Sequence, residues 1–403
     1  CFIRWRRPMC LATAAAYAGM IQRLLLTGHA LILYCQNVTS LTQIILDRAF
    51  HTMSQTTEAS LSSISKNTAW RKAFIAALLD FEHNIVAPGV DVRTEITGPF
   101  VDALFAEDET IQKTLSDGTL FEFFYRSKIA RDFIMSEPDM PDHAWEPQTT
   151  KTLLHLARGA KNVVVGGAYF GDHSILIAKK IASNQGVVHA FEPNHDQRNM
   201  LLHNAKLNNL SNIQARSEGL WENSSTNLAL VGYDSFAHSE TVDAHREDAF
   251  QTITMEDYLK SQDVTQLDLI MLDIEGAEFS ALKGAEKFLA QPTGQAPDIV
   301  FEVHRHYVDW SAGLGNTELI KYLSQHGYQV YAIRDYNSNV NMSGKLVEII
   351  PAEEVYLEGP PHGFNMVASK KPMAFTDPLF KVCTQLSPKL LRHKNVPLHQ
   401  PTK

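Results

Sequence analysis

The most informative stretch of this 403-residue chain is Asn162-Val-Val-Val-Gly-Gly-Ala-Tyr-Phe-Gly171. A β-branched run that ends in closely spaced glycines is typical of a buried strand turning tightly into a helix. Outward from it, short apolar runs alternate with amphipathic helical stretches, and further runs cover residues 187–191, 267–274 and 298–303. Because these runs are continuously apolar, they predict strands buried on both faces. The sequence therefore predicts an α/β fold with a doubly wound, mostly parallel sheet, to which residues 328–333 and 364–368 would add an antiparallel edge.

The glycine turn and the end of the second apolar run predict a nucleoside site. Ligands of such sheets bind at the carboxyl ends of the strands, and glycines there let the backbone approach the ligand closely. Glu192 ends the second run, where a carboxylate can accept both hydroxyl hydrogens of a ribose. The pattern Gly166-x-Ala168-x-x-Gly171 is also a loose dinucleotide fingerprint. An NAD-dependent oxidoreductase is therefore an alternative at this point.

Acidic and imidazole side chains follow the next two runs. The third run ends in Asp273-Ile-Glu-Gly-Ala-Glu278, and the fourth ends in Glu302-Val-His304. Alternation along a strand places Asp273 and Glu275 on one face, and Glu302 and His304 on one face of the next strand. We expect these strand ends to meet in the same crevice, with Glu278 serving helix capping rather than chemistry.

Together these motifs resemble the FkbM-type methyltransferases of the class I S-adenosylmethionine-dependent superfamily. The resemblance covers roughly residues 145–335, and its most specific part is the Asp-Ile-Glu-Gly-Ala-Glu block. It also rests on Gly167-Ala168-x-x-Gly171, Phe191-Glu192-Pro193, residues 252–259, 282–285 and Phe301-Glu302-Val303-His304. The family implies a seven-stranded Rossmann-like methyltransferase sheet, S-adenosyl-L-methionine bound over the first two strand ends, and O-methylation of a sugar, glycan or natural-product hydroxyl.

The resemblance implies cofactor contacts from the glycine turn and the neighbouring strand ends. The candidates are Gly167, Ala168, Gly171, Asp172, Glu192, Pro193 and Asp273. The family usually has an acid where this chain has Val165, and Asp172 is the candidate replacement. Because that anchor is altered, a non-catalytic cofactor-binding protein is a further alternative.

His304 is the expected general base, because an imidazole with a reference pKa of ~6.5 suits proton transfer at neutral pH. Asp273 and Glu275 complete the predicted catalytic set. The predicted substrate contacts are Trp145, Gln148, Glu302 and His304. Carboxylates and imidazole together can also bind a divalent ion, but separated carboxylates are common in such crevices, so no metal is predicted.

The charge distribution argues against nucleic acid as a partner. The net charge is -9; residues 1–52 carry +4 and residues 371–403 carry +5, which leaves -18 for residues 53–370. So acidic a body repels a phosphate backbone. The expected partner is a small-molecule or glycan acceptor, and the oligomeric state is left open.

Cysteine placement favours the cytoplasm. All four cysteines lie outside residues 53–382, so the body contains neither disulfide pairs nor zinc-type spacing. Arg23 and His29 interrupt the apolar runs of the first segment before they reach the ~20 residues of a membrane span. We therefore expect no stable membrane insertion.

Four segments are expected along the chain. Residues 1–52 read as a non-native or disordered extension, with Met53 as the authentic start. Residues 53–147 read as a small helical cap and linker, because apolar side chains such as Leu120, Phe123 and Phe124 recur at helical spacing. Residues 148–370 would be the methyltransferase domain, and residues 371–403 a flexible basic tail.

Overall fold

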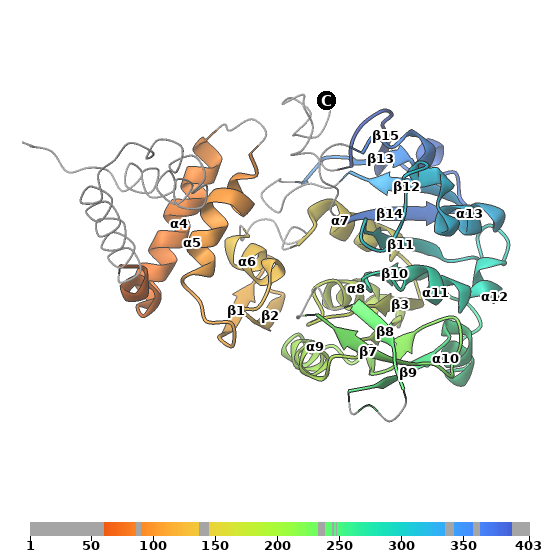
Figure 1. The fold of residues 1–403 in the computed structure, drawn as a ribbon, viewed down its shortest axis with the longest axis horizontal. Coiled ribbons are helices and arrows are strands. Elements are labelled where there is room, and N and C mark those ends of the chain that lie inside the picture. The colour runs from red at the N-terminus through yellow and green to blue at the C-terminus, as the bar shows by residue number, and fades with distance from the viewer. Residues whose placement is uncertain are drawn as a thin grey trace, which may run out of the picture. The chain divides into compact units, whose positions relative to one another are not determined.

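The computed structural model divides into two compact units, residues 1–107 and 108–403 (Figure 1). It describes residues 60–85, 90–136, 145–232, 238–243, 246, 248–334, 342–357 and 363–388. The expected extension of residues 1–52, and residues 389–403 of the expected tail, lie outside the described residues. Among the described residues, no helix combines the length and the apolar character that a membrane crossing requires.

The described part of the first unit is helical. Helix α4 (Thr68–Asn84) begins at Asn67, whose side chain accepts hydrogen bonds from the backbone N–H groups of Ala69 and Trp70. A single π-helical turn (Arg93–Thr97) leads into α5 (Gly98–Asp102). The Arg93 guanidinium donates to the buried Glu82 carboxylate over 2.7 Å, which ties this turn to α4. The apolar core consists of Ile75, Leu78, Phe100, Val101 and Leu104.

An antiparallel hairpin opens the second unit, where helical spacing had predicted a helix. Strands β1 (Thr110–Thr114) and β2 (Leu120–Phe124) pair along their full length, and α6 (Lys128–Met135) follows. The prediction of a helix through residues 110–124 is therefore wrong. In Leu-Phe-Glu-Phe-Phe, residues 121 and 123 are fully buried while their neighbours are half-buried, which is the period of a strand. Leu120, Phe123 and Phe124 also satisfy helical spacing, so the two periods cannot be separated over five residues.

A mixed sheet of nine strands forms the centre of the second unit. Its order is β15-β13-β12-β14-β11-β10-β3-β4-β5 (Figure 1). Neighbours from β11 to β5 are parallel, whereas β14 runs antiparallel to both β11 and β12. The bounds are β3 Asn162–Gly166, β4 Val187–Phe191, β5 Ile213–Arg216, β10 Leu269–Leu272, β11 Asp298–Val303, β12 Gln329–Ile333, β13 Val347–Pro351, β14 Phe364–Ser369 and β15 Phe380–Val382.

The α/β class is confirmed, but among the described residues the sheet has nine strands rather than the expected seven. β13 pairs antiparallel with β12, and β15 pairs parallel with β13, so both extend the expected antiparallel edge. Their apolar runs are short and are interrupted by Glu348 and Lys381, which hides them in the sequence. Glu348 is buried because it pairs with the equally buried Arg334.

Helices cover both faces of the large sheet. On one face, α10 (Met255–Ser261), α11 (Glu278–Lys283), α12 (Glu286–Leu289) and α13 (Glu318–Gln325) share one buried apolar cluster with alternate residues of the strands. The remaining strand residues face α7 (Pro147–Leu156), α8 (Ser174–Ile181) and α9 (His195–Leu207), which contact one another and strands β11, β4 and β5. Burial on both faces explains the continuous apolar runs of the parallel strands.

A second sheet of four strands forms one wall of the site. Its order is β6-β9-β7-β8, with bounds Gly219–Leu220, Phe250–Ile253, Asn227–Val231 and His238–Thr241. It follows β5 in the chain, at the end of the parallel series.

Part of the expected flexible tail belongs to the sheet, because residues 380–382 form β15. After α14 (Met373–Thr376), β15 adds to β13 and buries the side chain of Phe380. The Lys371 ammonium also pairs with Asp298 over 2.8 Å. The expected tail is therefore corrected for these residues, because Leu-Phe-Lys-Val-Cys supplies an apolar strand among the lysines and prolines.

Candidate functional site

A crevice lies at the carboxyl ends of the parallel strands. The strand order reverses between β3 and β10, since β4 and β5 continue on one side and β11 on the other. Such a switch point is where open α/β sheets bind ligands. The crevice, including its part open to solvent, encloses about 910 Å³ of empty space. Its walls include the ends of β3, β4 and β10 together with side chains of β7 and β8.

Gly167 makes the turn after β3 possible. Its φ of +72° is a conformation that side-chain-bearing residues rarely adopt. A Cβ at this position would also lie 1.8 Å from the backbone oxygen of Asp273. Any other residue would therefore push apart the ends of β3 and β10, which carry the floor of the crevice.

Glu192 lies just beyond β4 with its carboxylate held by the backbone. Oε2 accepts from the N–H of Tyr169 and Oε1 accepts from the N–H of Asn194, both over 2.8 Å. The residue is 7% exposed and lines the crevice. Each carboxylate oxygen has a second lone pair, so both can still accept from a ligand. The backbone thus fixes the orientation of a two-pronged acceptor.

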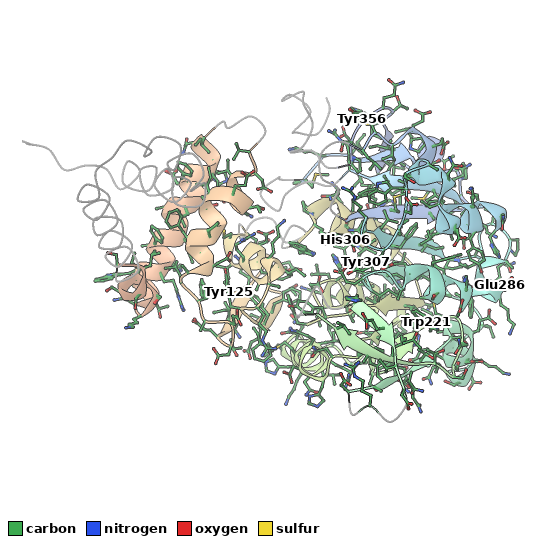
Figure 2. The ribbon with its side chains drawn as sticks, in the orientation of Figure 1. Tyr125, Trp221, Glu286, His306, Tyr307 and Tyr356 are labelled. Atoms are coloured by element: carbon green, nitrogen blue, oxygen red, sulfur yellow. The ribbon has the colours of Figure 1, made fainter. Side chains whose placement is uncertain are left out.

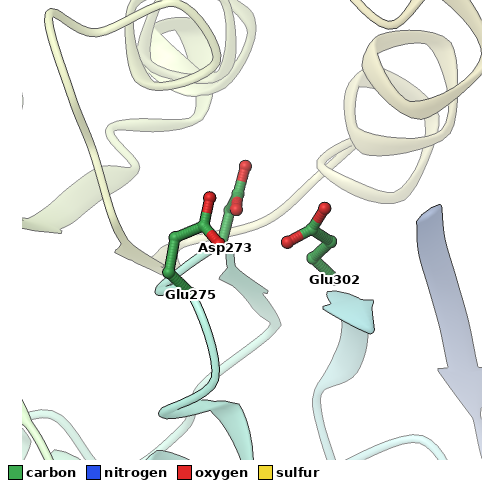
Figure 3. Close-up of side chains that lie close together, drawn as sticks. All are labelled: Asp273, Glu275 and Glu302. Carbon is green, nitrogen blue, oxygen red and sulfur yellow. The ribbon is translucent and has the colours of Figure 1, made fainter. Parts of the chain in front are cut away.

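Three carboxylates meet at the other end of the crevice, and we call Asp273, Glu275 and Glu302 the acid cluster. One oxygen of each lies within 4.8 Å of an oxygen of the other two. Figure 3 shows the carboxylates of Glu275 and Glu302 on either side of Asp273. The structure therefore brings together the ends of β10 and β11, as the parallel sheet predicts.

Burial and mutual repulsion raise the pKa values of two members of the acid cluster. Burial first, and then the carboxylates of Glu302, Glu146, Glu275 and Glu278, raise the pKa of Asp273 well above its ordinary value. Burial also raises the pKa of Glu275, although a hydrogen bond from Tyr307 opposes it. A positively charged group in this space would relieve the same repulsion.

Glu278 supports the turn that carries two members of the acid cluster. Its carboxylate accepts from the backbone N–H groups of Ile274, over 2.9 Å, and Gly276, over 3.1 Å. Burial nevertheless raises the pKa of Glu278 to about 7. The side chain is 3% exposed and caps this turn, which matches the structural role expected of it.

His304 lies beside Glu302 but outside the acid cluster. A Cβ on Gly363 would meet Oε1 of Glu302 at 1.8 Å and Cδ2 of His304 at 2.8 Å, so all three are neighbours. The backbone N–H of His306 donates to Nδ1 of His304 over 3.1 Å. In the neutral ring the hydrogen then sits on Nε2, so the ring presents a donor there rather than a base.

A buried polar group forms beside the glycine turn. Nε2 of His173 lies 3.8 Å from both the Asp172 and the Glu146 carboxylates. Burial alone would lower the pKa of His173, but Asp172 and Glu146 outweigh it and the pKa is raised. Burial, reinforced by Glu146, raises the pKa of Asp172. Asn365 donates to the Glu146 carboxylate over 2.7 Å, which links this group to β14.

The crevice contains part of the predicted set. Its lining includes Gly167, Asp172, Glu192, Pro193, Asp273 and Glu275. Ala168 and Gly171 shape the turn from beneath: Ala168 is 1% exposed, and a Cβ on Gly171 would meet Leu201 at 2.7 Å. Glu302 and His304 stand at the end of β11, outside this lining.

The two predicted substrate contacts at the start of α7, Trp145 and Gln148, do not line the crevice. Gln148 is 1% exposed within the first turn of α7. The half-buried ring of Trp145 lies 5.9 Å from the Lys128 ammonium. Their roles as substrate contacts remain predictions.

Several crevice residues carry no local signal in the sequence. Ile129 comes from α6, and the Tyr169 hydroxyl donates to Ser127 over 3.2 Å, so the segment after the hairpin helps to form the site. His173 and Glu146 meet only because α7 lies against α8. His173 directly follows the glycine turn, a position that could have identified it, but nothing near it in sequence indicates its partner Glu146.

Comparison with known proteins identifies the domain. The family model of the methyltransferase FkbM domain matches residues 166–330, which confirms the resemblance. No curated protein matches the chain.

Three solved structures are similar to the chain. For methyltransferase FkbM from Methylobacillus flagellatus KT the identity is 17% and the TM-score 0.31, with 52% of this chain and 44% of that chain covered. For M. jannaschii TYW2 in complex with AdoMet the identity is 15% and the TM-score 0.32, with 66% of this chain and 86% of that chain covered. For the O-methyltransferase from Bacillus cereus in complex with SAH the identity is 14% and the TM-score 0.32, with 58% of this chain and 85% of that chain covered.

The similarity spans less than half the length of the FkbM structure. The family match is the comparison that counts: residues 166–330 of this chain match the model of the methyltransferase FkbM domain.

Proposed function

We propose that the chain is an S-adenosylmethionine-dependent O-methyltransferase acting on a hydroxyl of a sugar, glycan or natural product. The observation that best supports the proposal is that carboxylates at the ends of two strands lie in one crevice. Glu192 lies on one side of Gly167 and Asp273 on the other, at the carboxyl ends of β4 and β10, the two parallel strands that flank β3. The FkbM domain match supports methyl transfer as the reaction class.

The residues of the crevice fit S-adenosylmethionine by their chemistry. Glu192 offers two oriented oxygens to the two ribose hydroxyls. Phe191, Leu220 and Leu228 supply apolar surface for an adenine ring. The carboxylate of Asp172, near Glu146, suits the amino group of the methionine end. It would replace the acid that the family usually has at the position of Val165.

Proton transfer is assigned to the acid cluster rather than to His304. When bound, S-adenosylmethionine supplies a methyl group on a sulfonium, and its transfer to a hydroxyl oxygen releases one proton. We assign Asp273, in its ionised form, to take this proton, because the residue lines the crevice at the end of β10. Nε2 of His304 carries the hydrogen of its ring, so we assign His304 to donating a hydrogen bond to the acceptor.

An open aromatic groove beside the acid cluster suits a polar acceptor with a ring face. Arg305, His306, Tyr307, Asp309 and Trp310 line it after β11. His306 and Tyr307 lie together in Figure 2. The Tyr307 hydroxyl bonds to Glu275, which connects this groove to the acid cluster.

Titration of the full chain with S-adenosylhomocysteine and, separately, with NAD tests the proposal. We expect saturable calorimetric binding of S-adenosylhomocysteine and none of NAD. Binding of NAD alone would support the oxidoreductase alternative, and binding of neither would reject a cofactor site of this kind.

A further inference from the structure

We propose that the acid cluster, completed by Asn365, binds one hard divalent cation such as Mg²⁺, Mn²⁺ or Ca²⁺. Such ions are bound through oxygen ligands, chiefly carboxylates and amide carbonyls. The crevice end formed by β10, β11 and β14 supplies both kinds of oxygen.

The spacing of the three carboxylates matches a shared ion. Ca²⁺ binds oxygens at ~2.3–2.6 Å, so two ligands on opposite sides of the ion stand about 5 Å apart, and about 4 Å for Mg²⁺. The oxygens of Asp273, Glu275 and Glu302 lie within 4.8 Å of one another. All three side chains are half-buried, which leaves room for the water or acceptor oxygens that complete the coordination of such ions.

Asn365 provides the second, independent observation. It is 3% exposed, and its Oδ1 has no hydrogen-bond partner in the part of the chain that the structure describes. Asn365 stands directly opposite Glu302 in the pairing of β14 with β11, so both side chains project from the same face of the sheet. Its Nδ2 donates to Glu146, one of the carboxylates that repel Asp273. A buried amide oxygen without a partner is costly, and a cation in this cluster would satisfy it.

The charges around Asp273 also favour a bound cation. The neighbours acting most strongly on Asp273 are the carboxylates of Glu302 and Glu146, while the Tyr307 hydroxyl and the His238 imidazole act on Glu275. Such a cluster is neutralised by protons or by a cation. His304 is not part of this donor set, because its Nδ1 already accepts from His306.

The cation would deepen the proposed function, and only this role rests on that proposal. An acceptor hydroxyl coordinated to the ion becomes more acidic, so a weaker base suffices to remove its proton. Binding itself can be measured without any acceptor or cofactor.

The test is calorimetric titration of the metal-free full chain with MnCl₂, MgCl₂ and CaCl₂. We expect one saturable site for at least one ion, reversed by a chelator. Glu302→Gln should weaken binding at least tenfold, because loss of a direct ligand costs no less than loss of a supporting residue. Asn365→Leu keeps the side-chain size, removes the amide oxygen and should also weaken binding about tenfold.

Two matched variants separate this proposal from the proposed function. Glu286→Gln removes one exposed charge at the start of α12 and should leave ion binding unchanged. Glu192→Gln should weaken S-adenosylhomocysteine binding and retain the ion. No saturable binding to the wild type, or equal binding by Glu302→Gln and the wild type, would overturn the cation site even where S-adenosylhomocysteine still binds.

Discussion

The carboxylates at the two ends of the crevice have opposite surroundings. At one end, backbone N–H groups of Tyr169 and Asn194 satisfy Glu192 and fix its direction. At the other end, the oxygens of Asp273, Glu275 and Glu302 face one another, and burial and repulsion raise the pKa of Asp273. A satisfied carboxylate suits recognition of neutral hydroxyl groups, whereas a crowded cluster suits a positive partner or a proton. We therefore expect substitutions at the first end to weaken cofactor binding, and substitutions at the second end to lower turnover.

The largest effect is expected for Asp273→Asn. The amide cannot take the acceptor proton, so kcat should fall by about 100- to 10,000-fold, the usual contribution of general base catalysis. The measurement is release of S-adenosylhomocysteine with any hydroxyl acceptor that the wild type methylates. Affinity for S-adenosylhomocysteine, measured in parallel, should change less than tenfold. An unchanged kcat would remove Asp273 from the reaction.

Stability should depend on pH through Glu278, which supports the crowded end. Its folded pKa is about 7 against 4.5 for the free group, so the folded chain holds this proton more tightly. Its contribution is full below about pH 4.5 and is lost as the pH rises through about 7, with a total of about 3 kcal/mol.

Urea unfolding of the wild type and Glu278→Gln at pH 4.5 and pH 8 measures this contribution. The wild type should lose about 3 kcal/mol relative to the variant between the two pH values. Parallel pH profiles for the two proteins would show that Glu278 ionises normally in the folded chain.

Glu192→Gln tests the recognition end. Hydrogen bonds to a charged acceptor contribute about 1.5–3 kcal/mol, so the dissociation constant for S-adenosylhomocysteine should rise roughly 10- to 100-fold. Calorimetry gives the affinity, and kcat at saturating cofactor should change less than in Asp273→Asn. A large loss of kcat at unchanged affinity would reverse the assignment of the two ends.

The smallest effect is expected for Tyr169→Phe. It removes the hydroxyl that donates to Ser127 but keeps the backbone N–H that holds Glu192. One neutral hydrogen bond contributes about 1 kcal/mol, so S-adenosylhomocysteine binding should weaken fivefold or less. A loss as large as that of Glu192→Gln would mean that the segment around Ser127 positions the recognition end directly.

The parallel half of the sheet was predictable because its chemistry is local in sequence. Each strand is a continuous apolar run, and Gly167, Glu192 and Asp273 follow the run that places them. Topology then brings the strand ends together without any further information.

The outer strands β13 and β15 and the hairpin were not predictable in the same way. In β13 and β15, Glu348 and Lys381 interrupt the apolar pattern, and the buried position of Glu348 depends on Arg334, which directly follows β12. In β2, five residues fit a helix and a strand equally well, and its docking depends on Asn204 of α9, which bonds to the backbone of Glu122. Both outcomes are set by partners distant in sequence.

The candidate site shows the same limit. His304 was placed correctly at the end of β11, but its ring tautomer depends on the backbone of His306. Asn365 stands more than sixty residues beyond Glu302 and meets it only through the pairing of β14 with β11. The residues of the site were therefore easier to predict than their protonation and their partners.

The most direct test is a crystal structure of the chain with S-adenosylhomocysteine bound. The proposed function predicts both ribose hydroxyls about 3 Å from the Glu192 carboxylate, with the sulfur turned toward Asp273. Adenosine bound outside this crevice, or a ribose held by other groups with Glu192 left to its backbone partners alone, would contradict it.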